Sequence, residues 1–283
     1  MPDVQATWPL DAINQAVRPA LPDFCAEWVA AIDSTNTELM RRARGGRDAP
    51  TLLVAQVQTA GRGRLGRSWL SLQGDAPVAA GITPLQHALT FSVGLSLNPR
   101  DWSGLSLAVG VSVAGSLHPA LQIKWPNDLW FDGRKLAGIL IETVAVAKRR
   151  YVVVGVGINI AVPAAAVLAA AGLAVAPAGL LELLPQCDAP AALWRIAPAL
   201  VAAILAFESQ GLAPFLDDFK SRDLLRDRAV VLSDGVVGVA CGVDAGGGLL
   251  VHTSSGMKTI TSAEVSVRAA VASAGFPARV VPP

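Results

Sequence analysis

The segment at residues 60–69, AGRGRLGRSW, combines glycines with guanidinium groups that could bind an anionic ligand. Its glycines match the spacing G-x-G-x-x-G and follow the apolar run TLLVAQV, so a dinucleotide-binding loop is the first hypothesis. That fold needs a helix opening at the last glycine and an acidic residue about 20 positions later. Gly74 and Pro77 interrupt the following segment, and no acidic residue lies between Asp75 and Asp101. The dinucleotide hypothesis is therefore disfavoured.

The charge balance argues against a polyanionic partner. The chain has 23 Lys and Arg against 22 Asp and Glu, a formal net charge of +1. Non-specific binding to nucleic acid depends on a surplus of cations on one face. We therefore expect no specific binding to DNA. The arginines of the loop are better suited to one small anion, with a solvated surface turn as the alternative.

The composition indicates one large domain, or a catalytic domain with a smaller second one, in a chain of 283 residues. A hydrophobic fraction of 52% excludes a disordered chain. Cys25, Cys187 and Cys241 lack the spacing of a metal site or a disulfide, which favours free thiols and a cytoplasmic location. The first residues lack the basic and apolar segments of a signal peptide.

One uncharged stretch, Ala161–Leu181, has the length of a membrane span. Pro163 and Pro177 leave 13 residues between them. These make about 20 Å of helix, against a hydrocarbon core of about 30 Å. We predict an Ala-rich helix pair or loop here, and no association with a membrane.

The first two thirds of the chain mix strand and helix patterns. Residues 27–46 predict a strand, a polar turn and a helix that ends at Gly45 and Gly46. The small-residue run at 105–117 predicts a helix or a buried segment. Three further strands are expected: TLLVAQV, and the two arms of a hairpin turning at Asp132 and Gly133. The run YVVVGVGINI at 151–160 predicts a buried strand whose glycines suit a neighbouring ligand.

The pattern changes near residue 228. After the charged segment DDFKSRDLLRDR come short β-rich runs separated by SDG, DAGGG and SSG. Evenly spaced short strands with turn residues predict a small barrel of about 50 residues. We therefore predict a catalytic domain over residues 1–228 and a barrel domain over residues 229–283.

Four motifs, in this order, resemble those of the biotin protein ligases. They are DSTNTE at 33–38, QTAGRGRLGRSW at 58–69, KWPNDLWFDGRKLAGILIE at 124–142 and GVGINI at 155–160. The resemblance implies an α+β fold of the class II synthetase type, a mixed sheet flanked by helices and followed by an SH3-like barrel. About 26 residues precede the first matching strand, too few for the helix-turn-helix domain of many bacterial relatives. The resemblance therefore implies the monofunctional type of ligase.

The resemblance also implies a two-step reaction. The carboxylate of biotin attacks the α-phosphate of ATP to give biotinyl-5′-adenylate and pyrophosphate. A lysine of the biotin carboxyl carrier domain of a carboxylase then takes the biotinyl group. Both steps develop negative charge on oxygens, so the site needs fixed cations and amide donors, with water kept out. Mg²⁺ is implied as the counter-ion of ATP, and a homodimer through an exposed sheet edge is left open.

The resemblance makes Ser34, Thr35 and Asn36 contacts of the biotin head group, and Gln58 a residue of the same pocket. Thr35 and Glu38 also have the spacing of a capping box, so a purely structural role as a helix start is the alternative.

In the arginine loop, Gly61 and Gly63 would let the backbone close on the ligand. Arg62 and Arg64 would offer guanidinium groups to carboxylate and phosphate oxygens. We expect this loop to be mobile when empty and ordered over the adenylate, with Arg64 among the catalytic residues.

The resemblance implies that the KWPND motif contributes Lys124, Trp125, Asn127 and Asp128 to the adenylate site, and a simple turn is the alternative. The resemblance places Asp128 where the carrier lysine must lose its proton. Lys135 matches the family lysine that contacts the carboxylate of biotin and the phosphate, where an ammonium offsets developing charge.

Several glycines and one asparagine complete the expected ligand-binding set. They are Gly138, Gly155, Gly157 and Asn159. The glycines allow either close approach of a ligand or tight packing of the sheet.

The chain departs from the family pattern at residues 74–82. Here GDAPVAAGI stands where a G-N-L-Y-x-S-like strand usually follows the loop, and Pro77 removes an amide donor. Two alternative functions are a lipoate or octanoate ligase and a non-catalytic biotin-binding regulator. The arginine loop, KWPND and the barrel together disfavour the first, and Lys135 and Asp128 disfavour the second.

Overall fold

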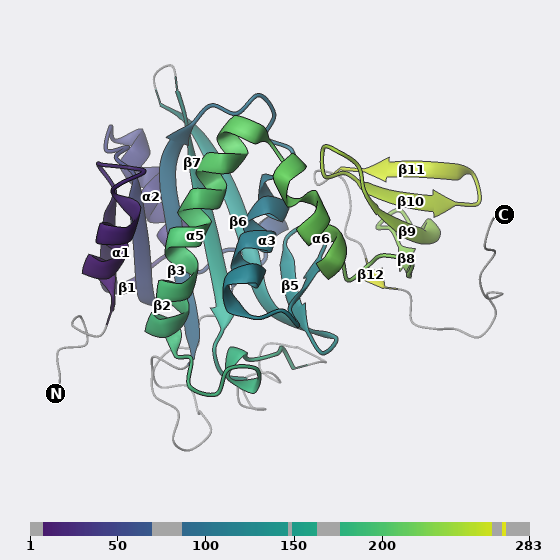
Figure 1. Cartoon of the computed structure of the whole chain (residues 1–283), viewed down its shortest axis with the longest axis horizontal. Coiled ribbons are helices and arrows are strands. Elements are labelled where there is room, and N and C mark those ends of the chain that lie inside the picture. The colour runs from purple at the N-terminus through teal and green to yellow at the C-terminus, as the bar shows by residue number, and fades with distance from the viewer. Residues whose placement is uncertain (1–7, 70–86, 147–148, 163–175, 262–267, 270–283) are drawn as a thin grey trace. The chain divides into compact units, whose positions relative to one another are not determined.

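A computed structural model describes residues 8–69, 87–146, 149–162, 176–261 and 268–269 (Figure 1). The chain divides into two compact units, Met1–Leu224 and Leu225–Pro283. The predicted domains, 1–228 and 229–283, place the boundary slightly later than this division.

A seven-stranded mixed sheet forms the centre of the first unit, in the order β1-β2-β3-β7-β6-β5-β4. β1 and β2 are parallel and the other neighbours are antiparallel. The strands are β1 (Cys25–Ile32), β2 (Thr51–Gln58), β3 (Ala88–Leu97), β4 (Gln122–Lys124), β5 (Asp128–Phe131), β6 (Arg134–Val146) and β7 (Arg149–Asn159). β2, β3 and β7 lie at the centre and are buried over most of their length, because both faces of the sheet are covered there. The predicted mixed sheet is confirmed.

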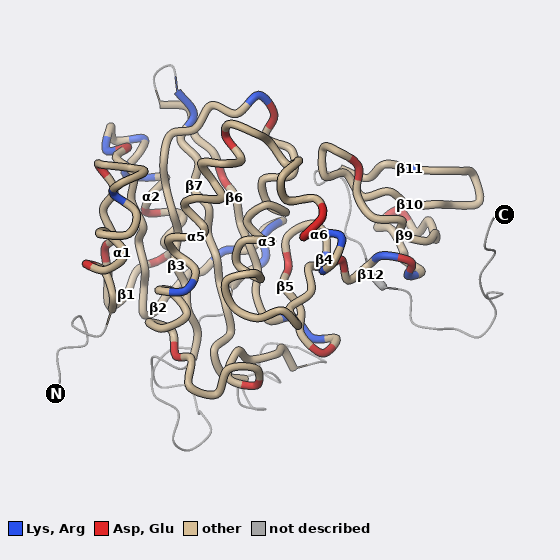
Figure 2. Tube along the Cα trace, viewed as in Figure 1, with Lys and Arg blue, Asp and Glu red and all other residues tan. Residues whose placement is uncertain are grey.

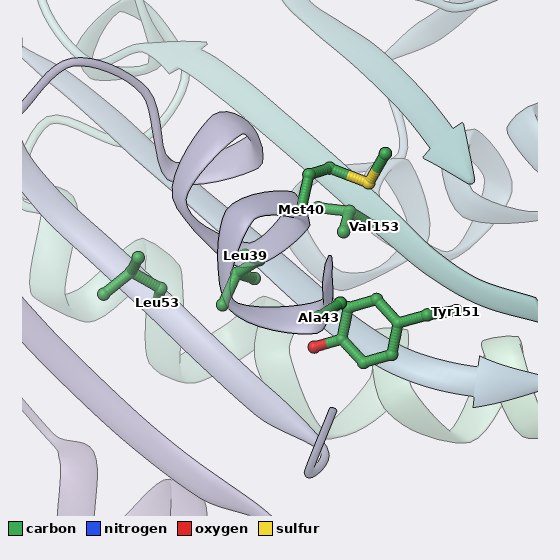
Figure 3. Packing of buried hydrophobic residues seen from close by; sticks show 6 residues of the cluster. All are labelled: Leu39, Met40, Ala43, Leu53, Tyr151 and Val153. Carbon is green, nitrogen blue, oxygen red and sulfur yellow. The ribbon is translucent and has the colours of Figure 1, made fainter. Parts of the chain in front are cut away.

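Helices cover both faces of this sheet. α2 (Thr35–Arg44) lies on one face, and α3 (Leu105–Leu117) and α5 (Ala189–Gln210) lie on the other (Figures 1 and 3). α3 is apolar on nearly all sides, as expected for a helix buried between the sheet and α5. The shorter elements are α1 (Leu10–Val17), α6 (Leu216–Arg222) and the 3-10 turns η2 (Arg64–Gly66), η4 (Leu180–Glu182) and η5 (Ala213–Phe215).

α5 is long and apolar enough to cross a membrane by length and hydropathy alone. Ile196, Leu200, Ile204 and Phe207 on this helix are nevertheless fully buried within the unit. This spacing of three to four residues marks one face turned toward the core. The helix is therefore a core element of this fold.

A cluster of buried side chains fixes α2 to the sheet (Figure 3). Leu39, Met40 and Ala43 of the helix pack against side chains of β2 and β7, which are Leu53, Tyr151 and Val153. Complete burial of one large apolar side chain contributes about 1.5–3 kcal/mol. The start of α2, which contains Ser34, Thr35 and Asn36, is thus held at a set position over the strands.

Two hairpins place the KWPND motif. Asp132 and Gly133 both have positive φ, 49° and 69°, as a tight two-residue hairpin between β5 and β6 requires. The turn between β4 and β5 contains a cis peptide bond at Trp125–Pro126. The hairpin predicted at Asp132 and Gly133 is confirmed, but its first arm is divided by this turn into the two strands β4 and β5.

The second unit contains a five-stranded antiparallel sheet in the order β11-β10-β9-β8-β12. The strands are β8 (Ala229–Val231), β9 (Val237–Val243), β10 (Leu249–Thr253), β11 (Gly256–Ile260) and β12 (Arg268–Ala269). Val230, Ala240, Leu249 and Val251 are completely buried and form its core. This separate small antiparallel sheet agrees with the β unit expected from the spacing of turns and with the SH3-like barrel that the resemblance implies.

Two predicted features lie outside the described residues in whole or in part. They are the unusual segment 74–82 and most of the uncharged stretch 161–181. Among the described residues, the next strand after the arginine loop is β3, which pairs with β2 on one side and β7 on the other.

Candidate active site

The start of α2 is capped by Ser34, whose side chain accepts a hydrogen bond from the N–H of Thr37 at 3.4 Å. The predicted capping box is therefore wrong: the cap lies one residue earlier than Thr35. Glu38 instead pairs with Arg41 and Arg42 on the surface of the helix. The side chain of Thr35 does not cap the helix and is buried in the protein.

Thr35, Asn36, Gln58 and Ser92 form a buried polar network, with exposures of 3%, 3%, 8% and 0%. The N–H of Thr35 donates to Gln58 Oε1 at 2.8 Å. The Thr35 and Ser92 hydroxyl oxygens are 2.6 Å apart, and Ser92 donates to Asn36 Oδ1 at 2.6 Å. The structure brings the three predicted residues together and adds Ser92. No signal in the sequence singles out Ser92, because β3 also carries hydroxyls at Thr90 and Ser96.

Asn36 extends the network toward β6. Its Nδ2 donates to the carbonyl of Leu140 at 3.2 Å and to Glu142 Oε2 at 3.1 Å. A Cβ on Gly155 would collide with the Asn36 side chain. Gly155 therefore makes room for a protein side chain, which supports the packing alternative at this position.

The arginine loop is a small hairpin. Arg62 and Ser68 form a β-bridge, and Gly63 N–H donates to the carbonyl of Arg67 at 2.7 Å. Positive φ at Leu65 and Gly66, 57° and 73°, turns the chain. Over the described residues 60–69 the only helical element is the short η2 turn, which agrees with rejection of the dinucleotide-binding loop.

Trp69 ends the loop and lies on the sheet. A Cβ on Gly157 of β7 would collide with its indole, and one on Gly138 of β6 would lie 3.3 Å from it. A Cβ on Gly61 would lie 2.6 Å from the Trp69 carbonyl oxygen. The missing side chains of these glycines thus leave space for Trp69. Trp69 belongs to the predicted motif, but the sequence did not indicate a role for it.

Arg62 and Arg64 bind different parts of the site. Arg62 forms an ion pair with Glu142 at 2.9 Å and a longer contact with the Thr37 hydroxyl at 3.5 Å. Arg64 donates to Asn127 Oδ1 at 3.2 Å. Burial lowers the pKa of Arg64, while the nearby charge of Asp128 opposes the shift. Arg64 remains a cation, because a guanidinium titrates far above neutral pH.

Lys135 and Asp128 form an ion pair, with Lys135 Nζ 2.7 Å from Asp128 Oδ1. Both side chains are partly accessible, at 39% and 22%. Asn127 is anchored between the loop and β6, since its Nδ2 also donates to the Ile139 carbonyl at 2.9 Å. The structure therefore gathers the predicted residues Arg64, Asn127, Asp128 and Lys135 at one place.

Other predicted residues lie at the margin. Lys124 places its ammonium 4.3 Å from the centre of the Trp130 ring, and Trp125 is buried. Ser34 serves as the helix cap. Asn159 lies at the end of β7 opposite Ala88, and the described contacts do not bring it into the network.

The charges around the site are interspersed. Figure 2 shows acidic and basic residues close together around α2, where Arg41 and Arg42 pair with Asp33, Glu27 and Glu38. Within the described ranges, no group of three or more His, Cys, Asp and Glu side chains is placed to hold a metal ion. Arg41, Arg42, Arg62 and Lys135 thus each have a carboxylate partner at close range.

Comparison with known proteins gives two family matches. Residues 28–159 match the biotin/lipoate A/B protein ligase family, and residues 229–268 match the biotin protein ligase C-terminal domain. The chain is 33% identical to the bifunctional ligase/repressor BirA of Salmonella typhimurium, over 92% of this chain and 76% of that protein. It is 30% identical to a biotin--[acetyl-CoA-carboxylase] ligase of Paracoccus denitrificans, over 84% of this chain and 98% of that one.

A solved structure is also similar. It is the biotin protein ligase of Aquifex aeolicus in complex with biotin and ATP, with a TM-score of 0.68 and 29% identity. The match covers 87% of this chain and 99% of the Aquifex chain.

Proposed function

The chain belongs to the biotin protein ligases. On this basis we propose which residues of the site bind biotin and which take part in the reaction. The enzyme is an ATP-dependent ligase that activates biotin as biotinyl-5′-adenylate and transfers it to a lysine of a carrier protein. The buried polar network binds the head group of biotin. The ionic cluster of Arg64, Asp128 and Lys135 handles the carboxylate and the phosphate.

The observation that carries this division is the buried network of Thr35, Asn36, Gln58 and Ser92. The ureido ring of biotin offers one carbonyl and two N–H groups. Two hydroxyl protons serve three contacts in the network, namely Thr35 with Gln58, Thr35 with Ser92, and Ser92 with Asn36. The hydroxyls can therefore change the direction of their hydrogen bonds to meet a donor or an acceptor.

The ionic cluster suits the two chemical steps. Lys135 is paired with Asp128 at 2.7 Å and remains partly accessible, so its ammonium can turn toward the oxygens of a mixed anhydride. That movement frees the Asp128 carboxylate to orient the carrier lysine and accept its proton. Arg64 supplies a second cation beside Asp128 and closes over the adenylate.

Mg²⁺ is proposed to enter with ATP. Asp128 is already paired with Lys135, and the described residues contain no acidic cluster that would form a dedicated site. Mg²⁺ commonly keeps several waters and binds through substrate phosphates with one or two carboxylates. When bound in that way, it would neutralise charge on the leaving pyrophosphate.

A lipoate or octanoate ligase is the second candidate, since one matching family includes both kinds of enzyme. The network argues against it. Lipoate and octanoate present apolar chains that offer these buried hydroxyl and amide groups no hydrogen bond, whereas the ureido ring of biotin offers a carbonyl and two N–H groups, and a site built for such polar groups rejects analogues that lack them. The match of residues 229–268 to the biotin protein ligase C-terminal domain supports the same choice.

The remaining assignments follow from the family. The acceptor is proposed to be the biotin carboxyl carrier domain of a carboxylase, and the location the cytoplasm, in keeping with three free cysteines. The catalytic domain is proposed to be followed by a barrel domain from residue 229.

Transfer to a carrier tests this function. The purified chain, biotin, ATP and Mg²⁺ are incubated with a biotin carboxyl carrier domain, and the carrier is weighed by mass spectrometry. We expect a mass increase of one biotinyl group, absent when the carrier lysine is replaced by arginine. A carrier that stays unmodified under these conditions, or that accepts lipoate or octanoate equally well, would refute the assignment.

A further inference from the structure

We infer that Glu142 is a positioning residue that couples closure of the arginine loop to recognition of the ligand head group. This inference rests on the proposed function of the network and of the loop. It concerns a residue on β6 that sequence reasoning did not assign to the site.

Glu142 contacts both halves of the site at once. Its Oε1 forms an ion pair with Arg62 at 2.9 Å, and its Oε2 accepts a hydrogen bond from Asn36 Nδ2 at 3.1 Å. The carboxylate is 20% exposed, whereas Arg62 is 51% exposed. Glu142 therefore joins an accessible loop side chain to a buried amide.

The same carboxylate lies in an otherwise apolar row. Because side chains alternate along a strand, Gly138, Leu140, Glu142, Val144 and Val146 share one face of β6. Val144 and Val146 pack against the core cluster under α2. A neutral glutamine would serve Asn36 equally well, so the negative charge at this position is explained by Arg62.

The contacts continue from Glu142 into the network. Asn36 accepts from Ser92, Ser92 contacts Thr35, and Thr35 N–H donates to Gln58. If Arg62 moves away with the loop, a half-buried carboxylate loses its counter-ion, and the hydrogen bond to Asn36 is left to balance it alone. A ligand that orders Asn36 favours the closed loop, and by linkage the closed loop favours the ligand by the same factor.

The test uses matched variants of the full chain. Glu142→Gln keeps the shape and the bond to Asn36 but removes the charge, and Glu142→Ala removes both contacts. Arg62→Gln removes the other partner, and the double variant Arg62→Gln/Glu142→Gln completes a cycle. Glu38→Gln is the control, because Glu38 also pairs with two arginines but lies outside the network.

Two readouts are measured. The first is trypsin cleavage after Arg64 and Arg67, with and without biotin and ATP. The second is the KM for biotin, compared with kcat, in pyrophosphate exchange. Loop cleavage in the ligand-free protein needs no enzymatic activity, so the inference can be judged even if the proposed function fails.

We expect Glu142→Gln to raise cleavage and the KM for biotin by about two- to fivefold, the scale of a partly exposed ion pair. Glu142→Ala should raise the KM by about tenfold, because Asn36 also loses an acceptor. The double variant should be no worse than either single variant, and kcat should change less than KM. Glu38→Gln should match the wild type in both readouts.

Wild-type cleavage and KM in Glu142→Gln would overturn the inference, as would additive effects in the double variant. An active wild type with these results would leave the proposed function intact. If trypsin cleaves the wild type as expected but the wild type shows no pyrophosphate exchange with biotin, the proposed function is refuted instead. Circular dichroism of each variant checks that it is folded.

Discussion

The two halves of the site differ in how their polar groups are satisfied. Thr35, Asn36 and Ser92 are at most 3% exposed, neutral and hydrogen-bonded to one another. Asp128 and Lys135 are charged, paired and partly accessible to water. A buried neutral network holds its oxygen and nitrogen atoms in one geometry, since moving one of them leaves an unpaired group, although the hydroxyl protons can still change direction. An accessible ion pair can exchange partners at lower cost, which a two-step reaction requires.

Replacing Lys135 by alanine should give the largest effect in this comparison. The change removes the ammonium from the ionic half and leaves the network in place. We expect adenylate formation to fall by about 10²-fold or more, the usual scale for one preorganised electrostatic contact. Pyrophosphate exchange measures the loss, with Lys220→Ala, which removes an exposed lysine of α6, as control. Near-normal exchange in Lys135→Ala would remove this residue from the mechanism.

Arg64→Gly should separate formation of the adenylate from its retention. Loss of a charge-assisted contact of about 1.5–3 kcal/mol corresponds to roughly tenfold to hundredfold faster release, if it acts on dissociation. Escaped biotinyl-adenylate acylates lysines indiscriminately. Albumin incubated with the variant, biotin and ATP should therefore become biotinylated, as a blot would reveal. A variant that still makes adenylate but labels albumin no more than the wild type would show that Arg64 does not retain the intermediate.

Ser92→Ala should lower both the stability of the protein and its affinity for biotin, because it breaks the buried network. The change leaves Asn36 Oδ1 without its 2.6 Å donor, which costs about 1–3 kcal/mol for a buried acceptor. Urea unfolding measures the stability, and calorimetry measures biotin affinity. Ser221→Ala, an exposed hydroxyl on α6, is the control and should be neutral. Wild-type stability and affinity in Ser92→Ala would mean that the network is not the binding element.

Gly155→Ala should have a similar or smaller effect, by displacing Asn36. The added methyl group collides with the Asn36 side chain, and overpacking of this kind costs about 1–3 kcal/mol. Gly115→Ala is the matched control, because nothing lies within 4 Å of a Cβ added to this helical position. It should stabilise the protein by about 0.5–1 kcal/mol. Equal melting temperatures for the two variants would contradict the tight packing at Gly155.

Local sequence patterns predicted most of the fold. The polar turn before α2, the hairpin at Asp132 and Gly133, and the short strands after residue 228 are each specified by neighbouring residues. The helix cap was misassigned by one residue because Ser34 and Thr35 both carry a hydroxyl. Only the observed bond to Thr37 N–H distinguishes them.

The parts of the site that were missed depend on distant partners. Ser92 and Glu142 lie 56 and 106 residues from Asn36, which they both contact. No local pattern carries that information. The glycines illustrate the same limit, since sequence alone cannot tell whether Gly157 makes room for a ligand or, as the structure has it, for Trp69.

Pyrophosphate exchange into ATP, with biotin, lipoate and octanoate supplied in separate reactions, determines which acid the site activates. We predict exchange that depends on biotin, with lipoate and octanoate near the background, because only biotin carries polar groups that match Thr35, Asn36, Gln58 and Ser92. Exchange supported equally by octanoate or lipoate, or no exchange with biotin, would show that the buried network does not select biotin.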